Sequence, residues 1–193
     1  FWVTQRGNKE PIKKYEQLDV HIVDARKWRG AYGTREQKAP SCASPDAGRT
    51  GKLHPEFGAL LPVKFVNGQE CAIWPLNLWG TGKDEGGNPT RGKFCGERRN
   101  LLALCSDFDD PIVVSIPTMS VGRWDAYVDG LVKVAKTHFS TQMTRIGVEM
   151  VERDSQAEYG AATFETLGYL PAETIAGGIA LRKQFKAMLG AII

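Results

Sequence analysis

The cysteines and histidines of this chain are residues whose types could bind a zinc ion. Cys42, Cys71 and Cys95 are dispersed through a polar stretch, and Cys105 lies within an apolar run. With His54 as a fourth ligand, the first three could hold a structural zinc in tetrahedral coordination. They could instead be buried thiols, because tryptophan stands three positions after Cys71, where a Cys-x-x-Cys pair would have its second cysteine.

Cationic and aromatic residues alternate in two stretches, "ARKWRGAY" at 25–32 and the region from 71 to 99. Single-stranded nucleic acids are held by aromatic rings that stack on bases and by cations that follow the phosphates, at roughly 1 to 3 kcal/mol per stacked base. The candidate nucleic-acid-binding residues are Arg26, Lys27, Trp28, Arg29, Tyr32, Trp74, Trp79, Lys93, Phe94, Arg98 and Arg99. Packing is the alternative for some of them, because Trp74 and Trp79 could form a small core for their own segment.

Charge is distributed unevenly along the chain. The net charge is +3, but residues 1–104 carry 17 Lys or Arg against 11 Asp or Glu, whereas residues 105–193 carry 8 against 11. A basic first half suits a polyanion partner, although a scatter of solvated lysines would give the same count.

Three features resemble parts of enzyme sites, and each has a simpler explanation. His21, His54 and His138 do not have the spacing of a metal site or of a catalytic triad. The glycine-rich segment 80–87 lacks the spacing of a phosphate-binding loop. The acidic run 107–110 could hold Mg²⁺ as a nuclease does, or form a tight turn between strands. We therefore predict no catalytic residues and a protein that is not an enzyme.

Hydrophobic periodicity predicts the elements that position these residues. Alternation of apolar residues indicates a strand, and apolar residues at helical spacing indicate a helix. The predicted elements are a strand at 18–25, a strand-like run at 60–66, a hairpin at 101–105 and 112–116, a helix at 120–136 with Ser120 as its N-cap, a second hairpin at 143–152 and 161–170, and a helix at 171–190.

This element order predicts a mainly β fold with two helices. It is the order of an OB-fold-like five-stranded Greek-key barrel that has a long insertion between its first two strands and a C-terminal helix. An α+β sandwich with the same order is the alternative. We predict a single domain over residues 1–193. Segment 28–97 is too long for a structureless loop and is predicted to be an inserted, loop-rich subdomain.

Several short motifs resemble those of a family of bacteriophage-encoded proteins found near replication and recombination genes. The resemblance covers about residues 18 to 152 and is carried by Cys42, Ser44 and Asp46; by Cys71, Pro75, Asn77, Trp79 and Gly80; by Gly92, Lys93 and Cys95; and by Pro117 and Thr118. It implies a single-stranded DNA-binding protein built on an OB-like barrel.

The expected function is therefore non-catalytic, largely sequence-independent binding of single-stranded DNA in phage replication or recombination. The expected partners are single-stranded DNA and further copies of the chain along the strand, with no membrane and no small-molecule substrate. No apolar run reaches the ~18 to 20 residues that span a bilayer, so the cytoplasm of the infected bacterial host cell is the expected location. The alternatives are a structural or filament-forming phage protein and a metal-dependent nuclease that uses Asp109.

Overall fold

The computed structural model of the chain describes residues 2–3, 13–14, 16–34, 37, 39–44, 49–83, 87–153 and 156–185. These residues divide into two compact units. The first unit contains the described residues of Phe1–Ala25 and Arg99–Leu189, and the second contains those of Arg26–Arg98. The strands β3 (Gln17–Ala31) and β6 (Gly96–Leu104) contribute residues to both units.

The fold is mainly β with two α-helices, as the sequence predicts. Among the described residues, seven strands form one antiparallel sheet in which β5, β4, β3, β6 and β7 follow one another, while β8 pairs with β3 and with β9. The long elements that follow β6 are β7 (Ile112–Ile116), α1 (Thr118–Lys133), β8 (Gln142–Arg153), β9 (Gln156–Tyr169) and α2 (Ala172–Phe185). A short separate sheet joins β1 (Trp2–Val3) to β2 (Lys13–Lys14).

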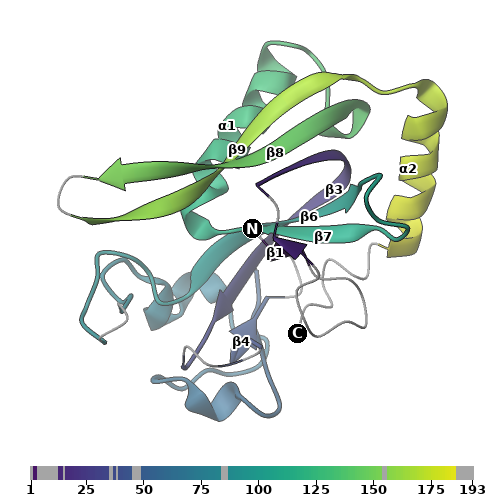
Figure 1. Cartoon of the computed structure of the whole chain (residues 1–193). Coiled ribbons are helices and arrows are strands. Elements are labelled where there is room, and N and C mark those ends of the chain that lie inside the picture. Colours follow the sequence, from purple (N-terminus) through teal and green to yellow (C-terminus); the bar gives the residue numbers. More distant parts are fainter. Residues whose placement is uncertain are drawn as a thin grey trace. The chain divides into compact units, whose positions relative to one another are not determined.

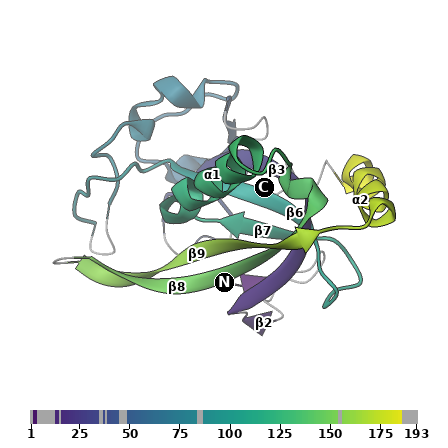
Figure 2. The same cartoon turned by 90° about the horizontal axis from the view of Figure 1, so that it is seen from above.

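Both predicted hairpins are present. The β6–β7 hairpin pairs Arg99 with Ile116 and Ala103 with Ile112, and the longer β8–β9 hairpin is drawn in green in Figures 1 and 2. The strand predicted at 18–25 is also confirmed and continues to Ala31. The closed barrel is not found, because among the described strands β7 and β9 do not pair and the sheet stays open.

The core of the first unit lies between the sheet and α1. Leu18, Val20 and Ile22 alternate along β3 and point to this side, where they meet apolar residues of the other strands. Trp124 of α1 fills the centre, with its ring centroid 5.3 Å from that of Phe164. Each large apolar side chain buried in this way contributes about 1.5 to 3 kcal/mol.

His21 and Val23 alternate with these residues along β3 and are buried on the opposite side. Val23 packs with Leu102 in a separate cluster that also includes Phe185 of α2. Helix α2 therefore covers part of this second face, and it follows β9 directly in the chain (Figure 1). Residues 186–190 of the predicted terminal helix lie outside the described residues.

Helix α1 begins two residues earlier than predicted. Its N-cap is Pro117, whose backbone is extended. Ser120 is therefore inside the helix, and the prediction that it is the N-cap is wrong. Its hydroxyl oxygen instead accepts a hydrogen bond of 2.9 Å from the backbone amide of Ala162 on β9.

The second unit consists of short elements joined by loops. They are β4 (Cys42–Ala43), β5 (Lys52–Leu53) and the 3-10 helices η1 (Gly58–Leu60), η2 (Cys71–Ile73) and η3 (Pro75–Asn77). The strand predicted at 60–66 is wrong. Pro62 has no amide hydrogen to donate to a neighbouring strand, and Phe65 is the one residue of this run that is buried. No helix in the described part of the chain is long and apolar enough to cross a membrane.

Candidate nucleic-acid interface

Trp79 is the most exposed large apolar or aromatic side chain in the second unit. It follows η3, and 77% of its surface is accessible to solvent. The ammonium group of Lys93 lies over its ring, 5.1 Å from the ring centroid. An exposed indole beside an ammonium group is able to stack on a planar ligand and to attract an anionic one.

Backbone hydrogen bonds hold the loop that carries Trp79. The amides of Gly80 and Gly82 both donate to the carbonyl of Gly92, at 3.0 and 2.9 Å, and the amide of Thr90 donates back to the carbonyl of Gly82. Gly80 has a φ of +83°, a conformation that residues with a side chain rarely adopt. Residues 80–82, directly after Trp79, therefore lie beside residues 90–92.

The hydroxyl of Thr81 forms hydrogen bonds at the base of this loop. Its single proton is shared between the carbonyl oxygens of Leu76 and Leu78, at 2.9 and 2.7 Å, and its oxygen accepts from the amide of Phe94 at 3.1 Å. Leu76 is buried in the core of the second unit. Since these bonds join the two arms of the loop to each other and to the backbone of the buried Leu76, the position of Trp79 is set by the backbone around it.

The loop also exposes residues that the sequence analysis missed. Leu78 and Ile73 are exposed near Trp79 in the chain, and the side chains of Lys83 and Arg91 are exposed on the two arms of the loop. The signal that could have found them is the pair of glycines at 80 and 82 opposite a third at 92, which indicates a tight return of the chain.

Trp74 lies in the core and offers no face to a ligand. Its side chain is fully buried, and its ring meets that of Phe65 edge to face with a centroid distance of 4.9 Å. The prediction that Trp74 stacks on bases is therefore corrected in favour of the packing alternative. A unit with so little regular structure has few other large apolar groups to form a core.

Trp28 is also buried, with 4% of its surface exposed. Its ring lies against Gly30, where an added Cβ atom would be 2.0 Å from the indole. The guanidinium of Arg98 lies over the ring at 5.7 Å and is also 5.9 Å from the ring of Tyr32. Trp28 thus packs beneath a cation, and we correct the prediction that it contacts bases directly. Tyr32 and Arg98 are partly exposed.

Several of the predicted cationic residues are paired with carboxylates. One oxygen of Glu97 accepts from Arg29 at 3.1 Å and lies 3.1 Å from the ammonium of Lys27. In the first unit, Arg99 pairs with Asp125 at 2.9 Å. These three cations are therefore neutralised in part by the protein itself, which weakens their attraction for phosphate.

The remaining predicted contact residues lie partly buried. Arg26 is partly exposed on β3, and Phe94 packs against the core of the second unit. In total, residues 26–98 carry 12 Lys or Arg and 7 Asp or Glu, a net charge of +5. The positive charge of the chain is thus concentrated in the unit that exposes Trp79.

The three cysteines predicted as zinc ligands are buried thiols. Burial raises the pKa of Cys42 to about 12, and the nearby thiols of Cys71 and Cys95 add to this shift. Burial likewise raises the pKa of Cys95 to about 12, with Cys71 again contributing. Such thiols are protonated at neutral pH as the chain stands, and they could bind zinc only by releasing these protons.

His54 makes contacts of a different kind. Its Nδ1 accepts hydrogen bonds from the amides of Glu56 and Phe57, and its ring stacks on that of Phe57. Within the described ranges, no three or more His, Cys, Asp or Glu side chains form a group that could hold a metal ion. The set of Cys42, His54, Cys71 and Cys95 therefore does not fit a zinc ion in this arrangement.

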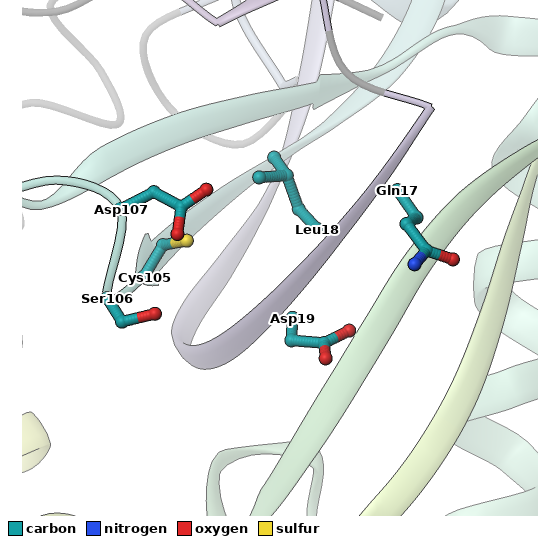
Figure 3. Close-up of a pocket in the computed structure, with 6 residues that line it drawn as sticks. All are labelled: Gln17, Leu18, Asp19, Cys105, Ser106 and Asp107. Atoms are coloured by element: carbon teal, nitrogen blue, oxygen red, sulfur yellow. The ribbon is translucent and has the colours of Figure 1, made fainter.

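The acidic run 107–110 forms the turn between β6 and β7, closed by a hydrogen bond of 3.2 Å from the amide of Phe108 to the carbonyl of Cys105. It borders a polar pocket of about 220 Å³ in the first unit (Figure 3). The pocket is lined by Gln17, Leu18, Asp19, Cys105, Ser106 and Asp107.

The guanidinium of Arg145 donates hydrogen bonds of 2.7 and 2.8 Å to the two carboxylate oxygens of Asp19. These bonds lower the pKa of Asp19. The pocket is smaller and more polar than the sites that hold organic ligands, which span roughly 300 to 1,000 Å³. We assign it no ligand.

Comparison with protein-family models, with curated proteins and with solved structures finds no match to this chain.

Proposed function

We propose that this chain binds single-stranded nucleic acid, with single-stranded DNA of a phage replication or recombination system as its ligand, and that it does so without catalysis. The observation that carries the proposal is the exposed indole of Trp79 with the ammonium of Lys93 over its ring. The host cytoplasm is the proposed location. Binding would be largely independent of sequence, because every base has a flat face to stack.

The order of the strands supports an OB-like architecture. In an OB barrel the first strand lies between the second and the fourth, and the third and fifth close the barrel. The order β9, β8, β3, β6, β7 is the one that remains when such a barrel is opened between its third and fifth strands. We propose that the sheet is an open variant of this fold and that the second unit is its enlarged first loop.

Contact would be made on one face of the indole. The ammonium of Lys93 covers the other face, so we expect the base to stack opposite to it. Lys83 and Arg91 are exposed on the same loop and would lie near the phosphates on either side. This arrangement needs neither Trp74 nor Trp28, whose roles are in packing.

Fluorescence anisotropy with labelled oligothymidine at low salt tests the proposal. A stacked base is worth roughly 1 to 3 kcal/mol, so Trp79→Ala should weaken binding about 5- to 150-fold. Tyr169→Ala is the matched control, because Tyr169 is an equally exposed aromatic residue on β9 of the first unit. Equal affinities of wild type and Trp79→Ala would contradict the proposed site.

A structural or filament-forming role is the second candidate, and one observation favours it. Val148 and Met150 of β8 are exposed, and the strand β9 that pairs with them contains no Lys, Arg or Pro. Strands at the edge of a sheet are commonly protected from self-association by such residues. Large assemblies in nuclease-treated samples, measured by sedimentation, would support this role, and a monomer would contradict it.

A further inference from the structure

Helix α2 approaches β3 closely at a glycine. A Cβ atom added to Gly178 would lie 2.4 Å from Cε1 of His21 and 2.9 Å from Cγ1 of Val23. Glycine in the middle of a helix costs about 1 kcal/mol relative to alanine. The close approach explains why glycine is present despite this cost, because any side chain at this position would push the helix away from the strand.

The imidazole beneath Gly178 has one satisfied nitrogen and one that has no partner. His21 is 3% exposed, and its Nε2 lies 2.8 Å from the carbonyl oxygen of Ser140. A carbonyl can only accept, so Nε2 carries the proton and Nδ1 is bare. Within the described part of the chain, Nδ1 has no hydrogen-bond partner. The neutral ring therefore packs with its Nδ1 edge toward α2.

Among the described residues, a second proton on this ring would find no free acceptor. The charged and titratable groups on the surrounding elements are Glu173, Arg182 and Lys183 of α2, Asp19 and Asp24 of β3, Arg145 of β8 and His138 next to η4 (Phe139–Thr141). Both carboxylates of β3 are engaged, Asp24 with Arg182 at 3.2 Å and Asp19 with Arg145. A buried, unpaired N–H costs about 1 to 3 kcal/mol, and more when it carries charge.

We propose that α2 is a pH-sensitive cover, and that protonation of His21 at Nδ1 releases it from β3. Release would expose the cluster of Val23, Leu102, Leu104 and Val113, against which Phe185 of α2 packs. This inference goes beyond the proposed binding function and does not depend on it.

The direction of the pH effect follows from burial. Burial lowers the pKa of His21 below its ordinary value of 6.5, and the bond to Ser140 offsets part of this shift. The released state takes up a proton at the ordinary pKa, so docking is fully stable above pH 6.5 and is lost as the pH falls below it. His138 also has a lowered pKa because of burial. Variants of each histidine are therefore needed to tell which one causes the pH dependence.

Hydrogen exchange measured by mass spectrometry on peptides from 172–185 tests the inference. After correction for intrinsic exchange rates, protection should fall below pH 6.5 by at most about tenfold per pH unit, down to the lowered pKa of the docked ring, while the β8–β9 hairpin stays protected. His21→Gln should abolish this pH dependence, and the matched control His138→Gln should retain it. Gly178→Ala should remove the protection of α2 at both pH 7.5 and pH 5.

Three results would overturn the inference. They are protection of α2 that does not change between pH 7.5 and pH 5, an unchanged pH dependence in His21→Gln, and loss of protection in β8–β9 together with α2. Should His21→Gln fail to fold, an NMR titration of wild-type His21 decides the matter. A midpoint below 6.5 that coincides with loss of α2 protection supports the inference, and a midpoint at or above 6.5 contradicts it.

Discussion

At the residue scale, two tryptophans five positions apart have opposite surroundings. Trp74 is fully buried against Phe65, whereas Trp79 is 77% exposed. Sequence composition could not separate them, because stacking on a base and packing in a small core call for the same side chain. What separates them is the backbone: Trp74 stands between two 3-10 helices, η2 and η3, and Trp79 precedes the tight return at Gly80.

This difference predicts unequal effects on stability. Trp74→Ala should reduce the free energy of unfolding by about 3 to 5 kcal/mol, because it leaves a large cavity. Trp79→Ala should change it by less than about 0.5 kcal/mol, since the side chain is at the surface. Urea denaturation followed by circular dichroism measures both. Similar losses for the two variants would show that the two indoles have similar surroundings.

The buried thiols predict low reactivity. With a pKa of about 12, Cys42 and Cys95 should react slowly with a disulfide reagent at pH 8 until urea unfolds the chain. The ordinary value of 9.0 returns on unfolding, so the folded state binds more protons above pH 9 and stability should fall as the pH rises beyond it. Rapid modification of native Cys42 would contradict this, as judged against the less buried Cys105.

At the element scale, periodicity predicted the order of strands and helices, but the closed barrel expected from that order is not found in the described part of the chain. The alternation of apolar residues in 18–25 and the helical spacing of the apolar residues around Trp124 reflect which face of each element is buried, and this pattern can be read from the sequence. Closure depends on how far the strands bend and coil, and no single residue encodes that. The start of α1 was also predicted wrongly, because a serine before an apolar helical pattern is typical of an N-cap. In the structure, the hydroxyl of Ser120 instead accepts a hydrogen bond from a backbone amide of β9, a contact that the local sequence does not indicate.

The contact between α1 and β9 can be tested through Ser120. Ser120→Ala leaves the buried amide of Ala162 without its acceptor, which should cost about 1 to 3 kcal/mol. Ser115→Ala, at an exposed position on β7, is the control and should change stability by less than about 0.5 kcal/mol. Thermal or urea unfolding measures the difference. A loss no greater than that of the control would show that the hydroxyl does not support β9.

At the scale of the whole molecule, positive charge and an exposed indole occur in the same unit. Residues 26–98 carry a net charge of +5, and sequence counts located this asymmetry in the first half of the chain. They could not show that Lys27, Arg29 and Arg99 are paired with carboxylates, because each partner is distant in sequence. The candidate site therefore contains fewer of the cationic residues than the sequence predicts.

Charge-driven binding predicts a steep dependence on salt. The logarithm of the binding constant for oligothymidine should fall linearly with the logarithm of salt concentration, because bound cations are released from the phosphates. Lys83→Ala should reduce that slope by about 0.7, the value for one lost phosphate contact on a single strand. Anisotropy titrations over a series of salt concentrations measure the slope. Affinity that does not vary with salt would argue against phosphate contacts.

The central claim is that the exposed face of Trp79 stacks on an unpaired base. Titration of intrinsic tryptophan fluorescence with oligothymidine at low salt tests it most directly. We predict quenching that saturates in the wild-type protein and is lost in Trp79→Ala, with the other four tryptophans unchanged. Absence of quenching in the wild type, or the same quenching in Trp79→Ala, would contradict the claim.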